Sequence, residues 1–180
     1  MDIFHVAQTA SFAEFLVAYN PSRVNAEVRG RSVLMSALTN ADPGARSAIA
    51  TRLLDDGADA TTSHGGVNAL HALLGAAQLA PETEAPLLRR LLDGGADVNA
   101  VSKEYGTPLQ LLMSQFVYSD EALSPLYDVL FTQADLDLLT EGAFGKSAYA
   151  MALKSGHRKT LRARMEQYLD HRGIKTPGVN

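Results

Sequence analysis

The sequence predicts an all-α fold, a solenoid of stacked helix-turn-helix units, and three observations support this prediction. Similar segments begin at residues 53, 91 and 129 (LLDDGADATT, LLDGGADVNA and VLFTQADLDL), each 38 residues after the last. Four other segments each place a helix-capping side chain before an apolar run, and glycines follow the first two repeated leucine pairs. A period of about 20–50 residues is typical of proteins in which each unit packs only against its neighbours.

The first predicted element is a helix over residues 11–20, SFAEFLVAYN. Its apolar residues recur at helical spacing, and Leu16 lies 38 residues before Leu54. We therefore expect residues 1–26 to form an N-terminal capping region, in which this helix is the second helix of a unit that has lost its first.

Each following unit is predicted to begin with a turn and a short helix. Side-chain oxygens of Ser, Asn and Thr cap helices because they accept hydrogen bonds from the free N–H groups of the first turn. Proline costs no hydrogen bond at the first helical position, and Pro108 directly follows a capping threonine. The sequence thus predicts four helices that start after Ser32, Asn68, Thr107 and Ser147.

The second half of each unit is predicted to be a helix that ends at the repeated apolar pair. Gly57 and Gly95 then stand where a helix commonly ends in a left-handed residue, a conformation that glycine adopts without steric cost. The third copy has Gln133 in this place, so we expect that turn to be built differently.

The last predicted element is a terminal helix over residues 159–169, with apolar residues on one face and charged residues elsewhere. Such a half-repeat cap closes a solenoid at its end. The predicted organisation is a single domain, with the capping region 1–26, repeats at about 27–62, 63–100, 101–138 and 139–172, and a C-terminal tail at 173–180.

The two halves of the unit together resemble the ankyrin-repeat family. Its pattern G-x-T-P-L-H-x-A-A is matched in part by Gly66, Leu70 and His71 and by Thr107-Pro108-Leu109, and L-L-x-x-G-A-D-V-N-A is matched at residues 91–100. The resemblance covers about residues 27–169 and implies about four divergent repeats. The period of 38 exceeds the family's period of about 33.

The additional residues fall between the two helices of a unit, at 75–86 and 114–125. Pro81, Pro86 and Pro125 lie there, and proline ends or starts helices. We therefore expect long connections between the helices of these units.

Composition and motifs favour a protein without catalytic chemistry. The chain has no cysteine, and its five histidines do not stand in a metal-binding spacing. Asp135, Asp137 and Glu141 begin like a calcium loop, but the required glycine is missing. The resemblance implies that His71 and His157 bond neighbouring turns. We therefore predict no enzyme activity, no cofactor and no metal site.

Charge is unevenly distributed along the chain. Residues 154–175 hold seven Lys or Arg and two acidic residues, so +5, and the remaining residues carry −9 of the total −4. The basic segment, with Arg158, Arg162 and Arg164, is interpreted either as a solvated cap face or as a contact for an acidic partner. Aromatic residues are not interleaved with these cations, which argues against nucleic acid as a ligand.

The resemblance also implies which residues contact a partner, because ankyrin repeats usually bind through their loop tips and the exposed face of each first helix. Tyr105 and Phe144 stand at adjacent tips, where they either brace irregular turns or contact the partner directly. The positions carried over by alignment are Arg29, Arg31, Asn40, His64, Val67, Lys103, Glu104, Tyr105, Gln115, Phe144 and Lys146.

These observations predict a non-enzymatic protein-protein interaction module, an adaptor or scaffold that presents a rigid, concave and mostly acidic surface. One alternative is an immunity-like inhibitor of a basic toxin or enzyme. An alternative of another class is a small hydrolase or metal enzyme on a divergent repeat scaffold. Residues 1–20 make a poor secretory signal, and no segment approaches the length of apolar sequence expected of a membrane span. We expect a cytoplasmic, bacterial monomer that binds another protein, including a basic one, but no nucleic acid and no membrane.

Overall fold

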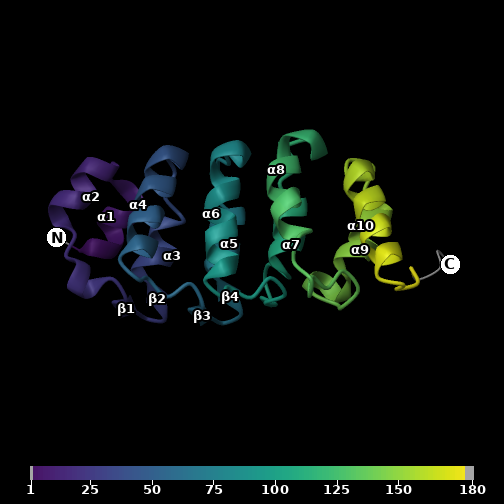
Figure 1. Cartoon of the computed structure of the whole chain (residues 1–180), viewed down its shortest axis with the longest axis horizontal. Coiled ribbons are helices and arrows are strands. Elements are labelled where there is room, and N and C mark those ends of the chain that lie inside the picture. Colours follow the sequence, from purple (N-terminus) through teal and green to yellow (C-terminus); the bar gives the residue numbers. More distant parts are fainter. Residues whose placement is uncertain (1, 177–180) are drawn as a thin grey trace.

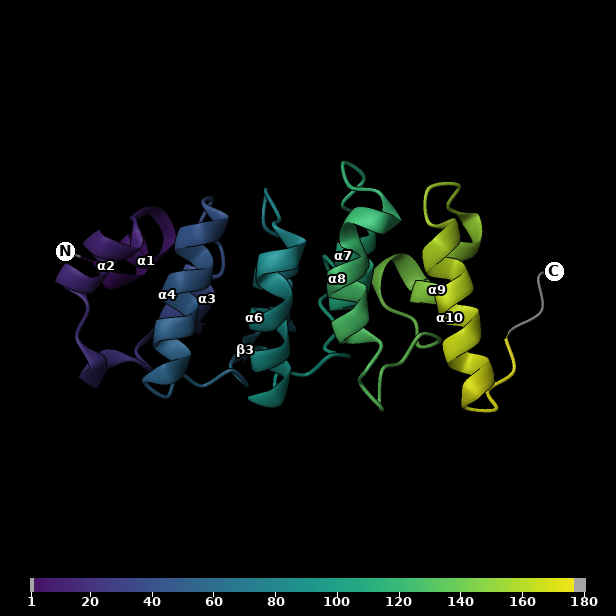
Figure 2. The same cartoon turned by 45° about the horizontal axis from the view of Figure 1, so that its top comes forward.

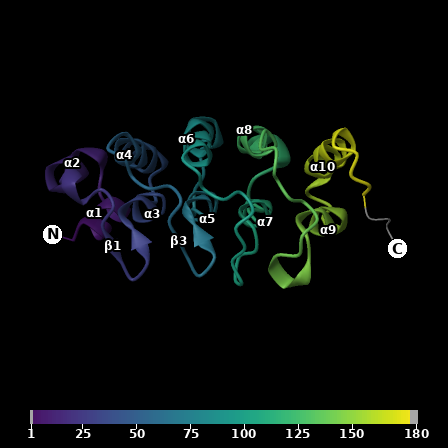
Figure 3. The ribbon, with the colours of Figure 1, turned by 60° about the horizontal axis from the view of Figure 1, so that its bottom comes forward.

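The computed structural model describes residues 2–176, which form a row of helix pairs in two layers (Figures 1 and 3). The N- and C-termini lie at opposite ends of the row (Figure 1). The inner layer holds the first helix of each pair: α1 (Ile3–Thr9), α3 (Val33–Ala37), α5 (Ala69–Leu74), α7 (Pro108–Met113) and α9 (Ala148–Lys154). The outer layer holds the second: α2 (Phe12–Ala18), α4 (Pro43–Asp55), α6 (Pro81–Asp93), α8 (Asp120–Leu130) and α10 (Lys159–His171).

Within each layer, every helix packs against the next one along the row. The outer helices α4, α6, α8 and α10 lie side by side (Figure 2). Leu53, Leu91 and Val129, which occupy one position of the 38-residue interval, are all buried between neighbouring units. Burying each of these side chains contributes about 1.5–3 kcal/mol, so the repeated apolar pairs hold the row together.

Four turns project from one edge of the row, beyond the inner layer (Figure 3). The first is the hairpin of β1 (Glu27–Val28) and β2 (Arg31–Ser32), and the second is that of β3 (Ser63–His64) and β4 (Val67–Asn68). The third turn has one bridge, between Ser102 and Gly106. The fourth holds a short 3₁₀ helix, η2 (Ala143–Gly145), and a further 3₁₀ helix, η1 (Pro21–Arg23), precedes the first hairpin. These turns are called tips one to four.

All four predicted capping residues are confirmed. Ser32 accepts a hydrogen bond from the N–H of Met35 at 3.1 Å. Asn68, Thr107 and Ser147 likewise cap α5, α7 and α9, and Pro108 occupies the first helical position of α7. The starts of the inner helices were therefore fixed by local side-chain chemistry that the sequence displays.

The two predicted glycine ends are also confirmed. Gly57 and Gly95 have φ of 89° and 92°, and the next residue in each case donates its N–H back to the helix, Ala58 to Leu53 and Ala96 to Leu91. Helix α8 ends without a left-handed residue, because the N–H groups of residues 132 and 133 bond the carbonyls three positions earlier. The different build expected at Gln133 is thus observed.

The N-terminal region differs from the prediction, because its unit has not lost its first helix. Helix α1 begins after Asp2, whose side chain accepts from the N–H of Phe4 at 3.1 Å. Its residues Ile3, Val6 and Ala7 are buried, and the helix packs against α3. Residues 2–26 therefore hold a complete helix pair instead of a half-repeat cap.

The expectation for the prolines is confirmed at one position and wrong at two. Pro81 starts α6, whereas Pro86 and Pro125 lie inside α6 and α8. A proline inside a helix leaves the carbonyl four residues earlier without its partner. Here those carbonyls belong to the exposed residues Glu82 and Glu121, so water can satisfy them.

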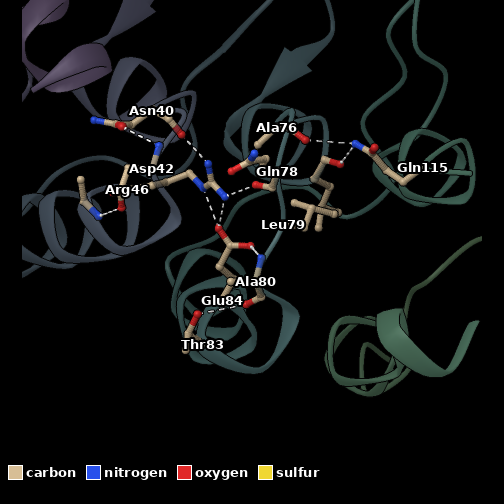
Figure 4. Close-up of polar contacts among 12 residues, drawn as sticks. Asn40, Asp42, Arg46, Ala76, Gln78, Leu79, Ala80, Thr83, Glu84 and Gln115 are labelled. Atoms are coloured by element: carbon tan, nitrogen blue, oxygen red, sulfur yellow. Dashed lines mark hydrogen bonds and ion pairs between the residues drawn. The ribbon is translucent and has the colours of Figure 1, made fainter. Parts of the chain in front are cut away.

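A buried arginine fixes the connections between the helices of the second and third pairs (Figure 4). Arg46 donates from Nε to Glu84 Oε1 at 2.6 Å, and both side chains are fully buried. Its other nitrogens donate to the carbonyls of Asn40 and, at 2.5 Å, Gln78. The second oxygen of Glu84 accepts from the N–H of Ala80 at 2.8 Å. One guanidinium therefore ties two connections and two outer helices together.

Arg158 forms an equivalent cluster between the fourth and fifth pairs, although the sequence predicts it in a basic segment that is either solvated or in contact with an acidic partner. Its side chain is 1% exposed and lies 3.2 Å from Asp120. It also donates to the carbonyls of Met113, Gln115 and Tyr118 at 2.9–3.0 Å. That expectation was wrong because residue 158 precedes α10 and points into the preceding connection.

We predict that Arg46→Met lowers the free energy of unfolding by about 3–5 kcal/mol, because Glu84 would remain buried without its partner. Urea unfolding followed by circular dichroism measures the change. Arg52→Met is the control in the same helix, since the Arg52–Asp56 pair is partly exposed, with side chains 41% and 20% accessible, and solvent weakens such a pair. A midpoint for Arg46→Met equal to that of the control would contradict the role of the cluster.

We predict that Gly95→Val destabilises the protein by about 1–2 kcal/mol, because a β-branched residue is strained at positive φ. Thermal unfolding measures the change in Tm. Gly156→Val is the matched control, since a Cβ at Gly156 meets open space and its φ is not left-handed. If both variants melted alike, the helix end would not require glycine.

Candidate binding face

The tips and the inner layer together form one face of the row, and two grooves run into it. The first groove, about 640 Å³, lies between tips one, two and three. Helices α3, α5 and α7 contribute Met35, Ala72 and Leu111 to it, and the tips contribute Arg29, Arg31, His64, Val67, Glu104 and Tyr105. An apolar groove with a few polar groups at its rim is the usual form of a ligand site.

The second groove, about 360 Å³, lies farther along the same face. Its apolar lining comes from Met113, Phe116 and Met151, and its charged lining from Lys146, Lys154 and the already paired Arg158. Phe116 is 71% exposed, in the connection between α7 and α8. Both grooves therefore combine apolar side chains with cations.

Most of the predicted contact residues are gathered on this face. Arg29, Arg31, His64, Val67, Glu104 and Tyr105 line the first groove, and Lys146 lines the second. Lys103 and Phe144 are exposed at tips three and four. The alignment therefore placed nine of the eleven positions on accessible tips.

The other two positions serve the fold. Asn40 is 2% exposed, and its amide donates to the carbonyls of Ala7 and Ala10 at 3.1 and 3.0 Å. The prediction that Asn40 contacts a partner is therefore wrong, because its side chain joins the second helix pair to α1. Gln115 is half-buried and donates to the carbonyls of Leu74 and Ala76 at 3.0 and 3.3 Å, so its amide nitrogen is also engaged inside the molecule.

Tips one and two touch through a position that only glycine can fill. Gly30 has a φ of 75°, and a Cβ built on it would overlap the ring of His64. The imidazole of His64 thus lies against tip one while the residue as a whole remains exposed. This contact sets the spacing of the first two tips along the groove.

His71 links tip two to tip three, as the resemblance implies. Its Nδ1 accepts from the N–H of Asn68 at 3.3 Å, and its Nε2 lies 2.9 Å from the carbonyl of Gly106. Because a carbonyl only accepts, Nε2 carries a proton, and Nδ1 also lies 2.9 Å from Oδ1 of Asn68. Burial lowers the pKa of His71, against a smaller opposite effect of the bond to Gly106. His157 instead is exposed in the second groove.

Gln110 links tip three to tip four, as His71 links tip two to tip three. Its Oε1 accepts from the N–H of Thr107 at 2.9 Å, and its Nε2 donates to the carbonyl of Lys146 at 2.7 Å. The four tips are therefore connected in series by one glycine contact and two side-chain bridges.

The two aromatic residues at the tips differ in their surroundings. Phe144 is 85% exposed and has a φ of 58°, so its ring does little to brace its turn. Tyr105 is 39% exposed, and its hydrogen bond to Glu104 raises the pKa of its hydroxyl. The geometry favours contact with a partner for Phe144, whereas Tyr105 has both a neighbour in its tip and a free surface.

The grooves differ in charge from the mostly acidic surface that the sequence analysis predicts. Glu104 is the one carboxylate among the residues that line them. Many of the exposed acids instead lie at or just after the ends of the outer helices, among them Asp55, Asp59, Asp93 and Asp135. The expectation was wrong because net charge along the chain does not show which side of a unit carries it.

Sequence reasoning missed the two buried ion pairs and the apolar lining of the grooves. A signal for the pairs was present, since Arg46 and Glu84 are 38 residues apart, and so are Asp120 and Arg158. Opposite charges one period apart occupy matching or adjacent positions of neighbouring units. Met35 and Leu111 carried no comparable signal, because an apolar residue of a short helix is as readily core as surface.

A comparison of the sequence with protein-family profiles and with curated proteins gives no match. The fold is similar to a solved structure, described as a functionally unknown protein from Leptotrichia buccalis C-1013-b, with a TM-score of 0.78 and 22% sequence identity. The similarity covers 97% of this chain and 96% of that chain. At this identity the likeness concerns the fold alone, and it extends along nearly the whole row.

Within residues 2–176, no three or more His, Cys, Asp or Glu side chains are grouped so as to hold a metal ion. Across the same residues, no helix combines the length and the apolar character needed to cross a membrane.

We predict that His71→Gln removes a pH-dependent part of the stability while keeping both hydrogen bonds, as Gln110 does. The unfolded chain binds a proton at His71 more readily than the folded chain, because burial lowers the folded pKa. The contribution is thus complete above the unfolded pKa, about 6.5, and is lost as the pH falls below it. Urea unfolding at about pH 7.5 and pH 5 should show wild type losing more free energy than the variant. Equal losses of unfolding free energy in wild type and variant would contradict a neutral His71 ring in the folded chain.

Proposed function

We propose that the protein is an ankyrin-type repeat solenoid that acts as a non-enzymatic protein-protein interaction module, an adaptor or scaffold. The proposal is supported by the order of elements in the second to fifth helix pairs, where a projecting tip precedes a capped inner helix and an outer helix. The bridges from His71 and Gln110 to the next tip agree with the resemblance seen in the sequence.

The first groove is the observation that carries the proposed function. It gathers side chains from tips one, two and three, so no single unit forms it. The contacts between successive tips fix its shape before a partner binds, and this lowers the entropy cost of association. The ring of Tyr105 lines this groove, and the exposed ring of Phe144 extends the face beyond it. Exposed aromatic residues commonly contribute much of an interface's binding energy.

The two alternatives differ in their support. An immunity-like inhibitor of a basic toxin or enzyme would place basic residues against grooves lined mainly by cations, and like charges oppose association. A small hydrolase or metal enzyme is tested directly, by an activity screen and metal analysis of the purified protein. Reproducible turnover, or metal bound in stoichiometric amount, would contradict the proposed function.

We predict that the paired substitution Tyr105→Ala and Phe144→Ala weakens partner binding about tenfold, since it removes two exposed rings from the face. Partners are captured from a lysate of the source organism on immobilised wild-type protein, and their affinity for each variant is then measured by calorimetry. Val17→Ala is the control, because Val17 is 91% exposed on α2, away from the grooves.

Circular dichroism separates this result from misfolding. Helicity and Tm should stay close to those of wild type, because the substitutions remove partly or fully exposed rings. A collapse of Tm would instead show that the two aromatics brace their turns. Unchanged binding would show that the partner contacts another surface.

A further inference from the structure

The proposed binding face carries positive charge on a protein whose total charge is negative. Four cations that line the two grooves form no ion pair with a described residue: Arg29, Arg31, whose guanidinium donates to the hydroxyl of Thr39 at 2.6 Å, Lys146 and Lys154. The one carboxylate among the lining residues is Glu104. The grooves thus carry +3, and since the chain totals −4, the remaining residues carry −7. The buried Arg158 is counted with the remainder, where Asp120 neutralises it.

The cations of the grooves also differ from those of the outer layer in their partners. On the outer layer, Arg52 pairs with Asp56 at 2.7 Å, Arg90 with Asp55 at 2.7 Å, and Arg164 with Asp128 at 2.6 Å. None of the four groove cations forms an ion pair with a described residue. Most arginines of the outer helices are thus neutralised within the protein, with Arg89 on α6 as an exception among the described residues, whereas all four groove cations are left to an external anion.

The positions of these cations suit an extended chain better than a single anion. Arg29 and Arg31 stand at tip one, Lys146 at tip four and Lys154 at the end of α9, so the cations flank both ends of the face. Between them lie the apolar side chains of both grooves, including Met35, Leu111 and the exposed Phe116. A ligand that satisfies the face must carry negative charges separated by apolar groups.

We propose that the binding face takes an extended acidic segment of a partner protein, with apolar residues in the two grooves and carboxylates beside the groove cations. This inference rests on the proposed protein-binding function and names the chemistry of the partner. Carboxylates of Asp and Glu form hydrogen-bonded ion pairs with Arg and Lys. Apolar side chains spaced along the same segment supply the surface that the grooves bury.

The inference is tested with random peptides of about twelve residues displayed on phage and selected on the immobilised wild-type protein. We expect the enriched peptides to contain Asp and Glu flanking apolar residues. One enriched peptide is synthesised with a version in which every Asp and Glu is replaced by Asn or Gln. Fluorescence polarisation should give a Kd at least about tenfold higher for the amide version, and the acidic peptide should bind more weakly as salt rises.

A matched pair of variants locates the charges that matter. Arg31→Gln with Lys154→Gln removes two cations from the face, while Arg89→Gln with Lys159→Gln removes two exposed cations from α6 and α10. Both variants have the same net charge, so a long-range effect of total charge would be equal in the two. The face variant should bind the acidic peptide about tenfold more weakly, and the outer variant should differ from wild type by less than about twofold.

Each other outcome overturns the inference in a distinguishable way. Enriched peptides without acidic bias that still lose affinity in the Tyr105→Ala variant would leave protein binding standing and refute the charge assignment. A single-stranded DNA oligonucleotide that binds more tightly than the selected peptides, with the same dependence on Arg31 and Lys154, would assign the face to nucleic acid. Failure to enrich any peptide would exclude an extended segment, while partner capture would still test the proposed function separately.

Discussion

The constraint on which the structure depends is the burial of two guanidinium groups, those of Arg46 and Arg158. A buried charge is tolerated only where hydrogen-bond acceptors surround it, and each of these arginines has carbonyl oxygens from inter-helix connections together with one carboxylate. These connections contain no helix or strand of their own. Because the arginines hold them, the outer helices keep a fixed position behind the inner layer, and the inner layer in turn forms the grooves.

The edge of the row that carries the four tips is held together by individual contacts between neighbouring tips. The contact of Gly30 with His64, and the bridges from His71 to Gly106 and from Gln110 to Lys146, connect tips that have little secondary structure. These links leave the outward side chains of the tips free. The tips therefore have a fixed backbone, while their outward side chains are available to a partner.

Much of the fold could be predicted from the sequence because its signals are local. Capping by Ser32 and termination at Gly95 depend on a few consecutive residues, so both appear in the sequence itself. The errors concern features that depend on distant residues. Asn40 was predicted to contact a partner, yet its amide donates to two carbonyls at least 30 residues away in the sequence. Arg158 was predicted at the surface, yet its guanidinium donates to a carbonyl 45 residues away. The tip residues could be located because aligning the repeats shows where each turn falls in the sequence. The charge of the binding face could not be predicted in this way, because it depends on which side of each unit faces solvent.

The spacing of the buried pairs also bears on how such an array can change in length. Arg46 and Glu84 belong to successive units, and so do Asp120 and Arg158, so the second and third units form one charge-matched couple and the fourth and fifth another. Loss of any one of these four units would leave three buried charges, so one of them would lack a partner of its own. The apolar pattern repeats with every single unit. Duplication or recombination of this sequence would nevertheless be tolerated in steps of two units more readily than in steps of one, because the buried charges are matched in pairs of units.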